Sequence, residues 1–158
     1  MKNQKSLTNK GFSLVELIIV VAIMAILIGV LAPQYLRYVE KSRLQKDNSA
    51  MGEIANVLKA ASAEEEVIKA LNTAGGTATY TFDNASGALK KSSVVALDDE
   101  LDVTVTIADV ALTSSTYKNA NYNVEIEVTL DTSTNIVTVT ANNWKSTPSD
   151  TTGSTKTF

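Results

Sequence analysis

An almost unbroken apolar run, from Phe12 to Ala32, constrains this chain more than any other feature of its sequence. A helix over this run is about 30 Å long, which matches the hydrocarbon core of a bilayer. One acidic side chain, Glu16, lies near the start of the run. A charge at a bilayer centre costs about 2.5–3.5 kcal/mol, and less near the interface. Glu16 therefore predicts a partner charge, which a plain membrane anchor would not need.

Two simpler interpretations of residues 1–33 explain less of the sequence. A secretory signal peptide fits the basic start and the small side chain of Ala32, but Pro33 follows at once and disfavours cleavage there. A single-pass anchor fits the length, and Tyr35 would lie in an interfacial aromatic belt. Basic residues on both flanks leave the orientation of such an anchor open. Neither interpretation explains Glu16.

The sequence Gly11-Phe12-Ser13-Leu14-Val15-Glu16, followed by the apolar run and Pro33, resembles the type IV pilin family, including its pseudopilin relatives. Glycine, aromatic residue, acid and proline coincide at fixed spacing, and the resemblance covers residues 1–60. It implies that a prepilin peptidase removes a leader, residues 1–11, by cleaving between Gly11 and Phe12. It also implies N-methylation of the new Phe12 amine, and assembly through Phe12, Glu16 and Pro33.

The chemistry that this resemblance implies agrees with the position of Glu16. Cleavage would create an α-ammonium on Phe12, which is charged at neutral pH, and one helical turn separates it from Glu16. In an array of identical subunits, the Glu16 carboxylate of one subunit would meet the Phe12 ammonium of its neighbour. Desolvation offsets much of this attraction. We therefore expect the pair to set the axial register of the subunits more than their affinity.

Beyond Pro33, apolar residues recur on one helical face. This pattern predicts an amphipathic helix over residues 34–71, which stops at Gly75-Gly76. Together with the apolar segment, residues 12–33, it would form one long helix with a kink or local break at Pro33. The predicted apolar face consists of Leu36, Val39, Leu44, Met51, Ile54, Leu58 and Ala61.

From Thr77 onward the apolar period changes to two, which predicts strands with one wet face. The resemblance implies an αβ-loop over residues 72–93. We expect an antiparallel sheet over 94–145 and a flexible tail over 146–158. Strands are predicted over residues 78–82, 101–107, 122–130 and 136–141, with the last two joined in a hairpin by turn formers at 131–135. The fold class is therefore α+β, with a long N-terminal helix packed against an antiparallel sheet, as in the type IV pilin fold.

Composition excludes several kinds of active site. The chain has no histidine and no cysteine, which removes the commonest general base, thiol chemistry and disulfides. The acidic pair Asp98-Asp99 reads as an exposed turn, and no loop has the ligand spacing of a calcium site. We expect no metal, no cofactor and no enzymatic activity. Trp144 is expected to cover an edge or end of the sheet, with sugar binding as the alternative.

The sequence thus predicts a structural subunit of an extracellular type IV pilus, polymerising with copies of itself for adhesion, surface motility or biofilm formation. The net charge of −3 disfavours nucleic acid as a primary partner. The resemblance implies a prepilin peptidase, a platform protein and an assembly ATPase as partners, and a single-pass location in the cytoplasmic membrane before export to the bacterial surface. We expect a major subunit, and three alternatives stay open: a pseudopilin of a type II secretion or competence system, a membrane-tethered binding domain that never polymerises, and a minor pilin at the filament tip.

Overall fold

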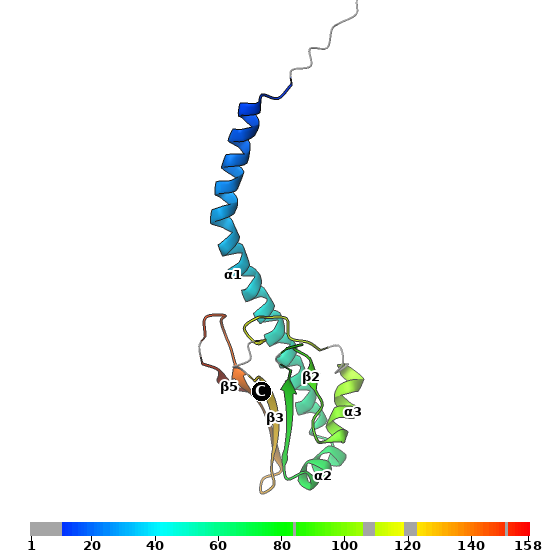
Figure 1. Cartoon of the computed structure of the whole chain (residues 1–158). Coiled ribbons are helices and arrows are strands. Elements are labelled where there is room, and N and C mark those ends of the chain that lie inside the picture. Colours follow the sequence, from blue (N-terminus) through cyan, green and yellow to red (C-terminus); the bar gives the residue numbers. More distant parts are fainter. Residues whose placement is uncertain (1–10, 84, 106–109, 119–122, 151) are drawn as a thin grey trace, which may run out of the picture. The chain divides into compact units, whose positions relative to one another are not determined.

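The computed structural model describes residues 11–83, 85–105, 110–118, 123–150 and 152–158. The predicted leader therefore lies outside the described residues, apart from Gly11. The chain divides into two units, Met1–Tyr38 and Val39–Phe158. Helix α1 (Leu14–Ala61) begins in the first unit and ends in the second (Figure 1). The fold class is α+β, as predicted, because the chain combines a long apolar N-terminal helix with a five-stranded antiparallel sheet.

In the first unit, α1 presents apolar side chains to its surroundings on every side. All residues from Gly11 to Tyr38 are exposed. The most apolar window of α1 has a mean hydropathy of 3.1 and is 0% buried, and the helix is long and apolar enough to cross a membrane. Pro33 removes one backbone donor, yet α1 continues through it. The local break expected at Pro33 is therefore not present in this chain.

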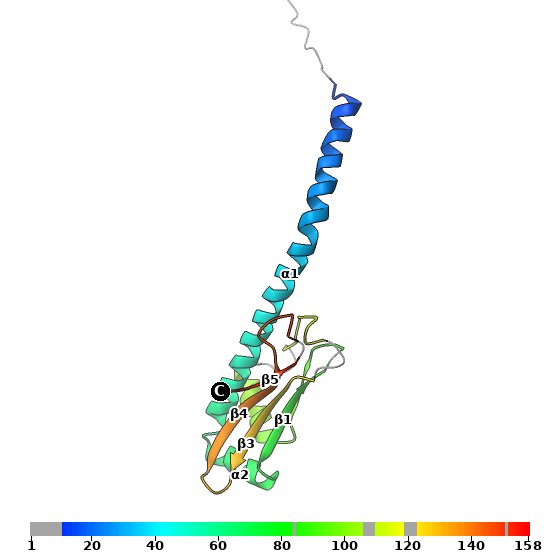
Figure 2. The same ribbon diagram turned by 90° about the vertical axis from the view of Figure 1, so that its left-hand side faces the viewer.

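In the second unit, one face of α1 enters the hydrophobic core. Leu44, Met51, Ile54 and Leu58 are each at most 1% exposed, and their spacing is that of a single helical face. These residues belong to the face that the sequence predicted. Within this unit the residues of α1 pack into the same core as the apolar side of the sheet. Figure 2 shows this part of α1 behind the strands.

The prediction of one continuous helix to Leu71 is wrong. Helix α1 ends at Ala61, and a second helix, α2 (Glu65–Thr73), follows a short turn. In that turn the Ser62 hydroxyl donates to the Lys59 carbonyl at 2.8 Å. The break changes the rotation of the following helix, so that Val67 and Leu71 both enter the core, at 2% and 0% exposure. Periodicity alone could not locate it, because apolar residues recur at helical spacing on both sides.

The helical region stops where the sequence predicted, at the two glycines. The Gly76 amide donates to the Leu71 carbonyl at 2.8 Å, and Gly76 has a φ of 83°. A left-handed residue with this bond is a common way to end a helix, and it favours glycine. The chain then enters the first strand.

The sheet has the strand order β2-β1-β3-β4-β5, with every neighbouring pair antiparallel. Ile126, Val128 and Leu130 of β3 are buried on one side, which confirms the predicted alternation. The predicted hairpin is also confirmed, because β3 and β4 pair from Glu125↔Asn142 to Asp131↔Ile136. Tyr122, the first residue of the predicted third strand, lies outside the described residues. The strands are β1 (Thr77–Phe82), β2 (Leu89–Lys90), β3 (Glu125–Asp131), β4 (Ile136–Trp144) and β5 (Ser154–Thr157).

The strand predicted over residues 101–107 is wrong within the described residues. A helix, α3 (Val95–Thr104), occupies most of this region, and residues 106–109 lie outside the described ones. Leu97 and Leu101 are four residues apart and both 0% exposed, whereas Val103 is 83% exposed. The apolar alternation that suggested a strand was therefore incidental, and the helical spacing of the two leucines decides which side chains are buried.

Two further expected segments differ from the structure. The αβ-loop predicted over residues 72–93 contains β1, which confirms the strand predicted over 78–82, and also β2, which was not predicted. The tail predicted over residues 146–158 contains β5, which pairs with β4 at Thr140↔Thr157 and Ala141↔Lys156. The Ser/Thr-rich composition suggested mobility, but backbone pairing at a sheet edge does not need apolar side chains. All four residues of β5 are exposed, so sequence pattern carried no signal for it.

Candidate functional site

The residues predicted to be cleaved and modified lie just before the start of α1. Gly11, Phe12 and Ser13 are not helical, and all three are exposed. The Phe12 side chain is 82% exposed. A Cβ built on Gly11 would meet no atom within 4 Å. The peptide bond between Gly11 and Phe12 is therefore exposed, and among the described residues no packing requires a glycine at position 11.

Glu16 takes part in the start of the helix. Its Oε2 accepts a hydrogen bond from the Ser13 backbone amide at 2.9 Å, and the Ser13 hydroxyl accepts one from the Val15 amide at 3.3 Å. The Leu17 amide donates to the Ser13 carbonyl at 3.2 Å, which is the first bond of the helical ladder. These contacts form a capping box, with Ser13 at the N-cap and Glu16 three residues later.

The capping box adds a local role for Glu16 to the sequence interpretation. Its carboxylate accepts a hydrogen bond from its own backbone, and its pairing with a charge from another molecule stays a prediction. The Ser13-x-x-Glu16 spacing directly before an apolar run is a known signature of a helix start. This spacing is the sequence signal that could have identified Ser13 as the N-cap. Pro33 contributes no hydrogen bond or contact to this group and lies well along the helix.

A second polar cluster ties a loop to α1 within the second unit. Asp47 is 2% exposed. Its carboxylate accepts hydrogen bonds from the Thr113 amide at 2.9 and 3.0 Å, from the Thr113 hydroxyl at 2.9 Å and from the Ser114 amide at 2.7 Å. Since several donors converge on one buried carboxylate, the charge is well solvated by the protein itself.

Glu40, which lies about two helical turns before Asp47 on α1, accepts hydrogen bonds from the same loop. Its Oε1 accepts from the Ser114 hydroxyl at 2.6 Å, the Thr116 amide at 2.9 Å and the Thr116 hydroxyl at 2.8 Å. Burial raises the pKa of the Glu40 carboxyl, but the hydrogen bonds from Ser114, Thr116 and Ser115 outweigh burial and lower that pKa from 4.5 to about 2. Sequence reasoning missed this cluster, because no local pattern connects α1 to a loop so far along the chain.

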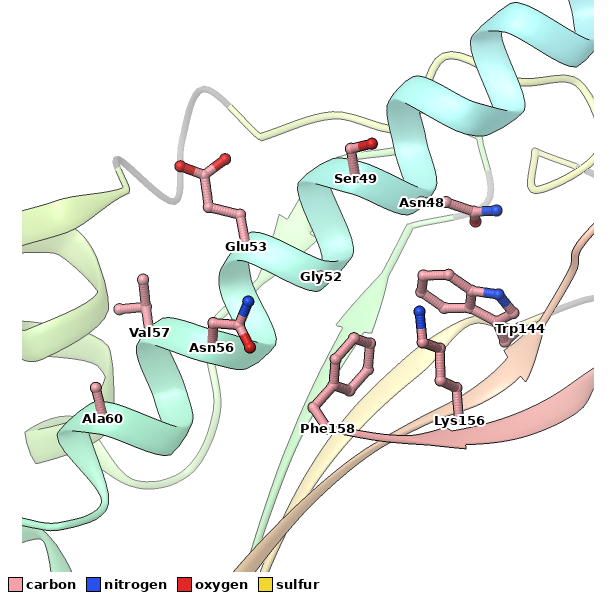
Figure 3. Close-up of a pocket in the computed structure, with 10 residues that line it drawn as sticks. All are labelled: Asn48, Ser49, Gly52, Glu53, Asn56, Val57, Ala60, Trp144, Lys156 and Phe158. Atoms are coloured by element: carbon pink, nitrogen blue, oxygen red, sulfur yellow. The ribbon is translucent and has the colours of Figure 1, made fainter.

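An open groove of about 830 Å³ lies between α1 and the C-terminal strand (Figure 3). The Lys156 ammonium lies 4.3 Å from the ring centroid of Trp144 and 4.9 Å from that of Phe158. The two rings meet edge to face at 5.8 Å. Trp144 is 8% exposed and ends β4, so it covers the end of the sheet, as predicted. A sugar could stack on Trp144 only after Lys156 had moved, so this arrangement does not favour the sugar-binding alternative.

The acidic pair of α3 does not form a turn. Asp98 is 3% exposed, and its Oδ1 accepts hydrogen bonds from the amide and the hydroxyl of Ser92, both at 3.1 Å. Asp99 lies on the exposed side of the same helix. Within the part of the chain that the structure describes, no group of three or more acidic side chains has the arrangement of a metal site.

Comparison with known proteins finds similarity over part of the chain. Residues 6–32 match the family model described as the prokaryotic N-terminal methylation motif. Two sequences of the type IV major fimbrial protein FimA of Dichelobacter nodosus are 40% and 42% identical to the chain over 50 residues. The match covers 32% of this chain and 32% or 31% of these proteins, so the chain spans about a third of the length of the curated relatives it matches. No solved structure matches the chain.

Proposed function

We propose that this chain, which carries the N-terminal segment of a type IV pilin, is a structural subunit of an extracellular type IV pilus. The observation that carries the proposal is the apolar segment of α1. This segment is exposed on all sides within its own chain, and its one acid, Glu16, lies within the residues that match the methylation motif. Such a surface needs a lipid bilayer or neighbouring helices to cover it.

The proposed maturation begins with cleavage between Gly11 and Phe12 by a prepilin peptidase. Both residues are exposed and outside the helix, which supports access by a protease. Cleavage removes the basic leader, residues 1–11, and leaves an ammonium on Phe12. N-methylation of this amine keeps its positive charge, so methylation does not prevent pairing with a carboxylate.

Assembly would bury the apolar segment of α1 among the same segments of neighbouring subunits. The Phe12 ammonium of one subunit would then meet the Glu16 carboxylate of another. An unpaired charge in such a core costs several kcal/mol, so the pair penalises any wrong axial stagger. Pro33 would lie near the end of the buried segment, where it leaves one carbonyl without its helical donor.

Before assembly, the subunit would reside in the cytoplasmic membrane through this single helix, and afterwards on the bacterial surface as part of the filament. A platform protein and a cytoplasmic assembly ATPase would extract it, since the sequence has no nucleotide-binding loop of its own. Adhesion, surface motility and biofilm formation are the outputs that such a filament would serve. The proposed role is structural and includes no catalytic step.

Mass spectrometry of the amino terminus, combined with electron microscopy of cell-surface filaments, tests the proposal. We expect a chain that begins at Phe12 with one added methyl group, and filaments that contain this chain. A chain found only with its leader attached, as a stable monomer in detergent, would favour the tethered binding domain. Loss of protein secretion after deletion, without surface filaments, would favour the pseudopilin.

A further inference from the structure

Charge is divided unevenly along the chain beyond its apolar run. Residues 34–48 follow that run directly and carry four cations and two acids, a net charge of +2. Residues 49–158 carry seven lysines and fourteen acids, a net charge of −7. Such an asymmetry indicates contact between the basic segment and an anionic surface. We call its four cations the basic collar: Arg37, Lys41, Arg43 and Lys46.

The cations of the basic collar have no partner of opposite charge within the described residues. All four are exposed, and none of them forms an ion pair or donates a side-chain hydrogen bond there. Other exposed lysines of the chain do have such partners, since Lys90 pairs with Asp83 at 3.4 Å and Lys91 with Asp102 at 2.8 Å. The positive charge of the basic collar is therefore open to a partner from outside.

The two acids of the same segment are directed into the protein. The carboxylates of Glu40 and Asp47 accept hydrogen bonds of 2.6–3.0 Å from the loop at residues 113–116. These bonds use amides and hydroxyls and none of the collar cations. The side of α1 that holds the loop thus carries the acids, and the exposed side of residues 41–46 carries cations alone.

The position of the basic collar matches the interface of a bilayer. Tyr35 and Tyr38 occur beside its first cation and are 66% and 73% exposed, as in the aromatic belts of membrane proteins. Lys41 lies eight residues after Pro33 on α1, about 12 Å along a helix axis. Helical side chains lean toward the N-terminus, and a long lysine stem extends its ammonium further in that direction. The collar cations therefore reach back toward the head-group layer.

We propose that the basic collar is a binding surface for the anionic head groups of phospholipids, where α1 leaves the membrane. This inference rests on the proposed function, which places the apolar run of the unassembled subunit in the bilayer. An anionic surface attracts the collar and repels the acidic remainder of the second unit. Head-group binding thus favours contact of the lipid with the collar over contact with the rest of that unit.

The test uses the full-length chain in micelles of a neutral detergent. Nuclear magnetic resonance follows the amide signals of residues 40–47 while phosphatidylglycerol, phosphatidylcholine or inorganic phosphate is added. Since each amide is observed separately, lipid bound by the lysines of the leader does not enter the result. Lys41→Gln/Lys46→Gln removes two collar charges, and Lys41→Arg/Lys46→Arg keeps them. Lys59→Gln/Lys69→Gln is the matched control, because both lysines are exposed and lie outside the collar.

We expect phosphatidylglycerol to shift these signals, and phosphatidylcholine and inorganic phosphate to leave them unchanged. Each cation near an anionic surface contributes about five-fold in affinity, so the collar glutamine variant should bind phosphatidylglycerol at least about five-fold more weakly. The arginine variant and the control should bind like the wild type, and added salt should weaken binding in all of them.

The inference is overturned if both lipids shift the signals equally, if inorganic phosphate alone reproduces the shifts, or if the collar and control glutamine variants behave alike. A loss of filaments in the collar variant with unchanged lipid binding would also overturn it, and would assign these cations to contacts between copies of the chain. The micelle measurement does not depend on polymerisation. Absence of filaments from the wild type would therefore reject the proposed function separately.

Discussion

Asp47 of α1 and Thr113 lie 66 residues apart in the chain, yet the Asp47 carboxylate accepts hydrogen bonds from both the amide and the hydroxyl of Thr113. The Ser114 amide adds a further bond to the same carboxylate. Because Asp47 is 2% exposed, water cannot replace these acceptors. Together with Glu40, this side chain therefore holds the loop on the helix.

Replacement of Asp47 by alanine should be strongly destabilising. The change leaves the Thr113 and Ser114 amides without an acceptor, and we expect the free energy of unfolding to fall by about 3 kcal/mol. Urea denaturation followed by the fluorescence of Trp144, the one tryptophan of the chain, measures it. Glu53→Ala is the matched control, since Glu53 is an exposed acid on the same helix and its loss should cost less than about 0.5 kcal/mol. Equal effects of the two changes would contradict the role given to Asp47.

Glu40 should make stability depend on acidic pH in a defined direction. The folded state lowers the pKa of this carboxyl from 4.5 to about 2, so its stabilising contribution is complete above pH 4.5 and is lost as the pH falls toward 2. We expect Glu40→Gln to be less stable than wild type by about 1–2 kcal/mol at neutral pH, and the difference to shrink through that acidic range.

Urea denaturation of both proteins at a series of pH values measures this difference. The carboxyls of Asp83 and Asp131, whose pKa values are also lowered to about 2 by local hydrogen bonds, titrate in both proteins and cancel in the comparison. A difference between wild type and Glu40→Gln that stays constant down to the lowest pH would rule out the proposed titration.

Replacement by phenylalanine should change the free energy of unfolding differently at two buried tyrosines. Tyr80 and Tyr117 are 0% and 1% exposed, and burial raises the pKa of both hydroxyls. The Tyr117 hydroxyl donates to Asn48 Oδ1 at 2.6 Å and accepts from the Lys145 amide at 2.9 Å. The Tyr80 hydroxyl has no hydrogen-bond partner among the described residues.

We therefore expect Tyr117→Phe to lower the free energy of unfolding by about 2 kcal/mol, because it leaves a buried amide and a buried amide oxygen with fewer partners. Tyr80→Phe removes a buried polar atom that lacks a partner and should be neutral or slightly stabilising. Thermal denaturation of the two variants side by side checks the contrast. A larger loss for Tyr80→Phe than for Tyr117→Phe would refute the hydrogen-bond assignment.

Alanine substitutions at Gly52 and Gly87 should have opposite effects on stability. A Cβ on Gly52 would lie 3.6 Å from a ring carbon of Phe158, an ordinary contact, and Gly52 is inside α1. Gly52→Ala should therefore raise stability by about 0.5–1 kcal/mol. Gly87 has a φ of 78°, and a Cβ there would lie 2.3 Å from the Leu112 carbonyl oxygen. Gly87→Ala should lower stability by 1 kcal/mol or more, about the size of a left-handed backbone penalty. The two melting temperatures should thus move in opposite directions.

The sequence predicted those features that depend on local periodicity. The alternation in β3, the hairpin at Asp131–Asn135 and the buried face of α1 each have a pattern that short-range physics explains. Helix α3 was mistaken for a strand because its apolar residues satisfy both periods, and only burial of Leu97 and Leu101 distinguishes them. The bonds from Glu40 and Asp47 to their loop could not be predicted, since they depend on the tertiary approach of distant segments.

For the candidate site, the sequence supplied the residues and not their contacts. Gly11, Phe12 and Glu16 were identified from the resemblance to the type IV pilins; Gly11 and Phe12 lie just before α1, and Glu16 lies in its first turn. Their roles in cleavage, methylation and assembly stay predictions. The hydrogen bond from the Ser13 amide gives Glu16 a further role at the start of the helix.

The contacts that hold the C-terminal segment in place bear on the redox conditions under which this protein can fold. Phe158 packs edge to face on Trp144, its amide donates to the Val139 carbonyl at 3.0 Å, and its own carbonyl accepts from Lys59 Nζ at 2.7 Å. These contacts are noncovalent, and the chain has no cysteine. The last strand is therefore held without a disulfide, and folding of this region should be indifferent to oxygen supply and to reducing agents.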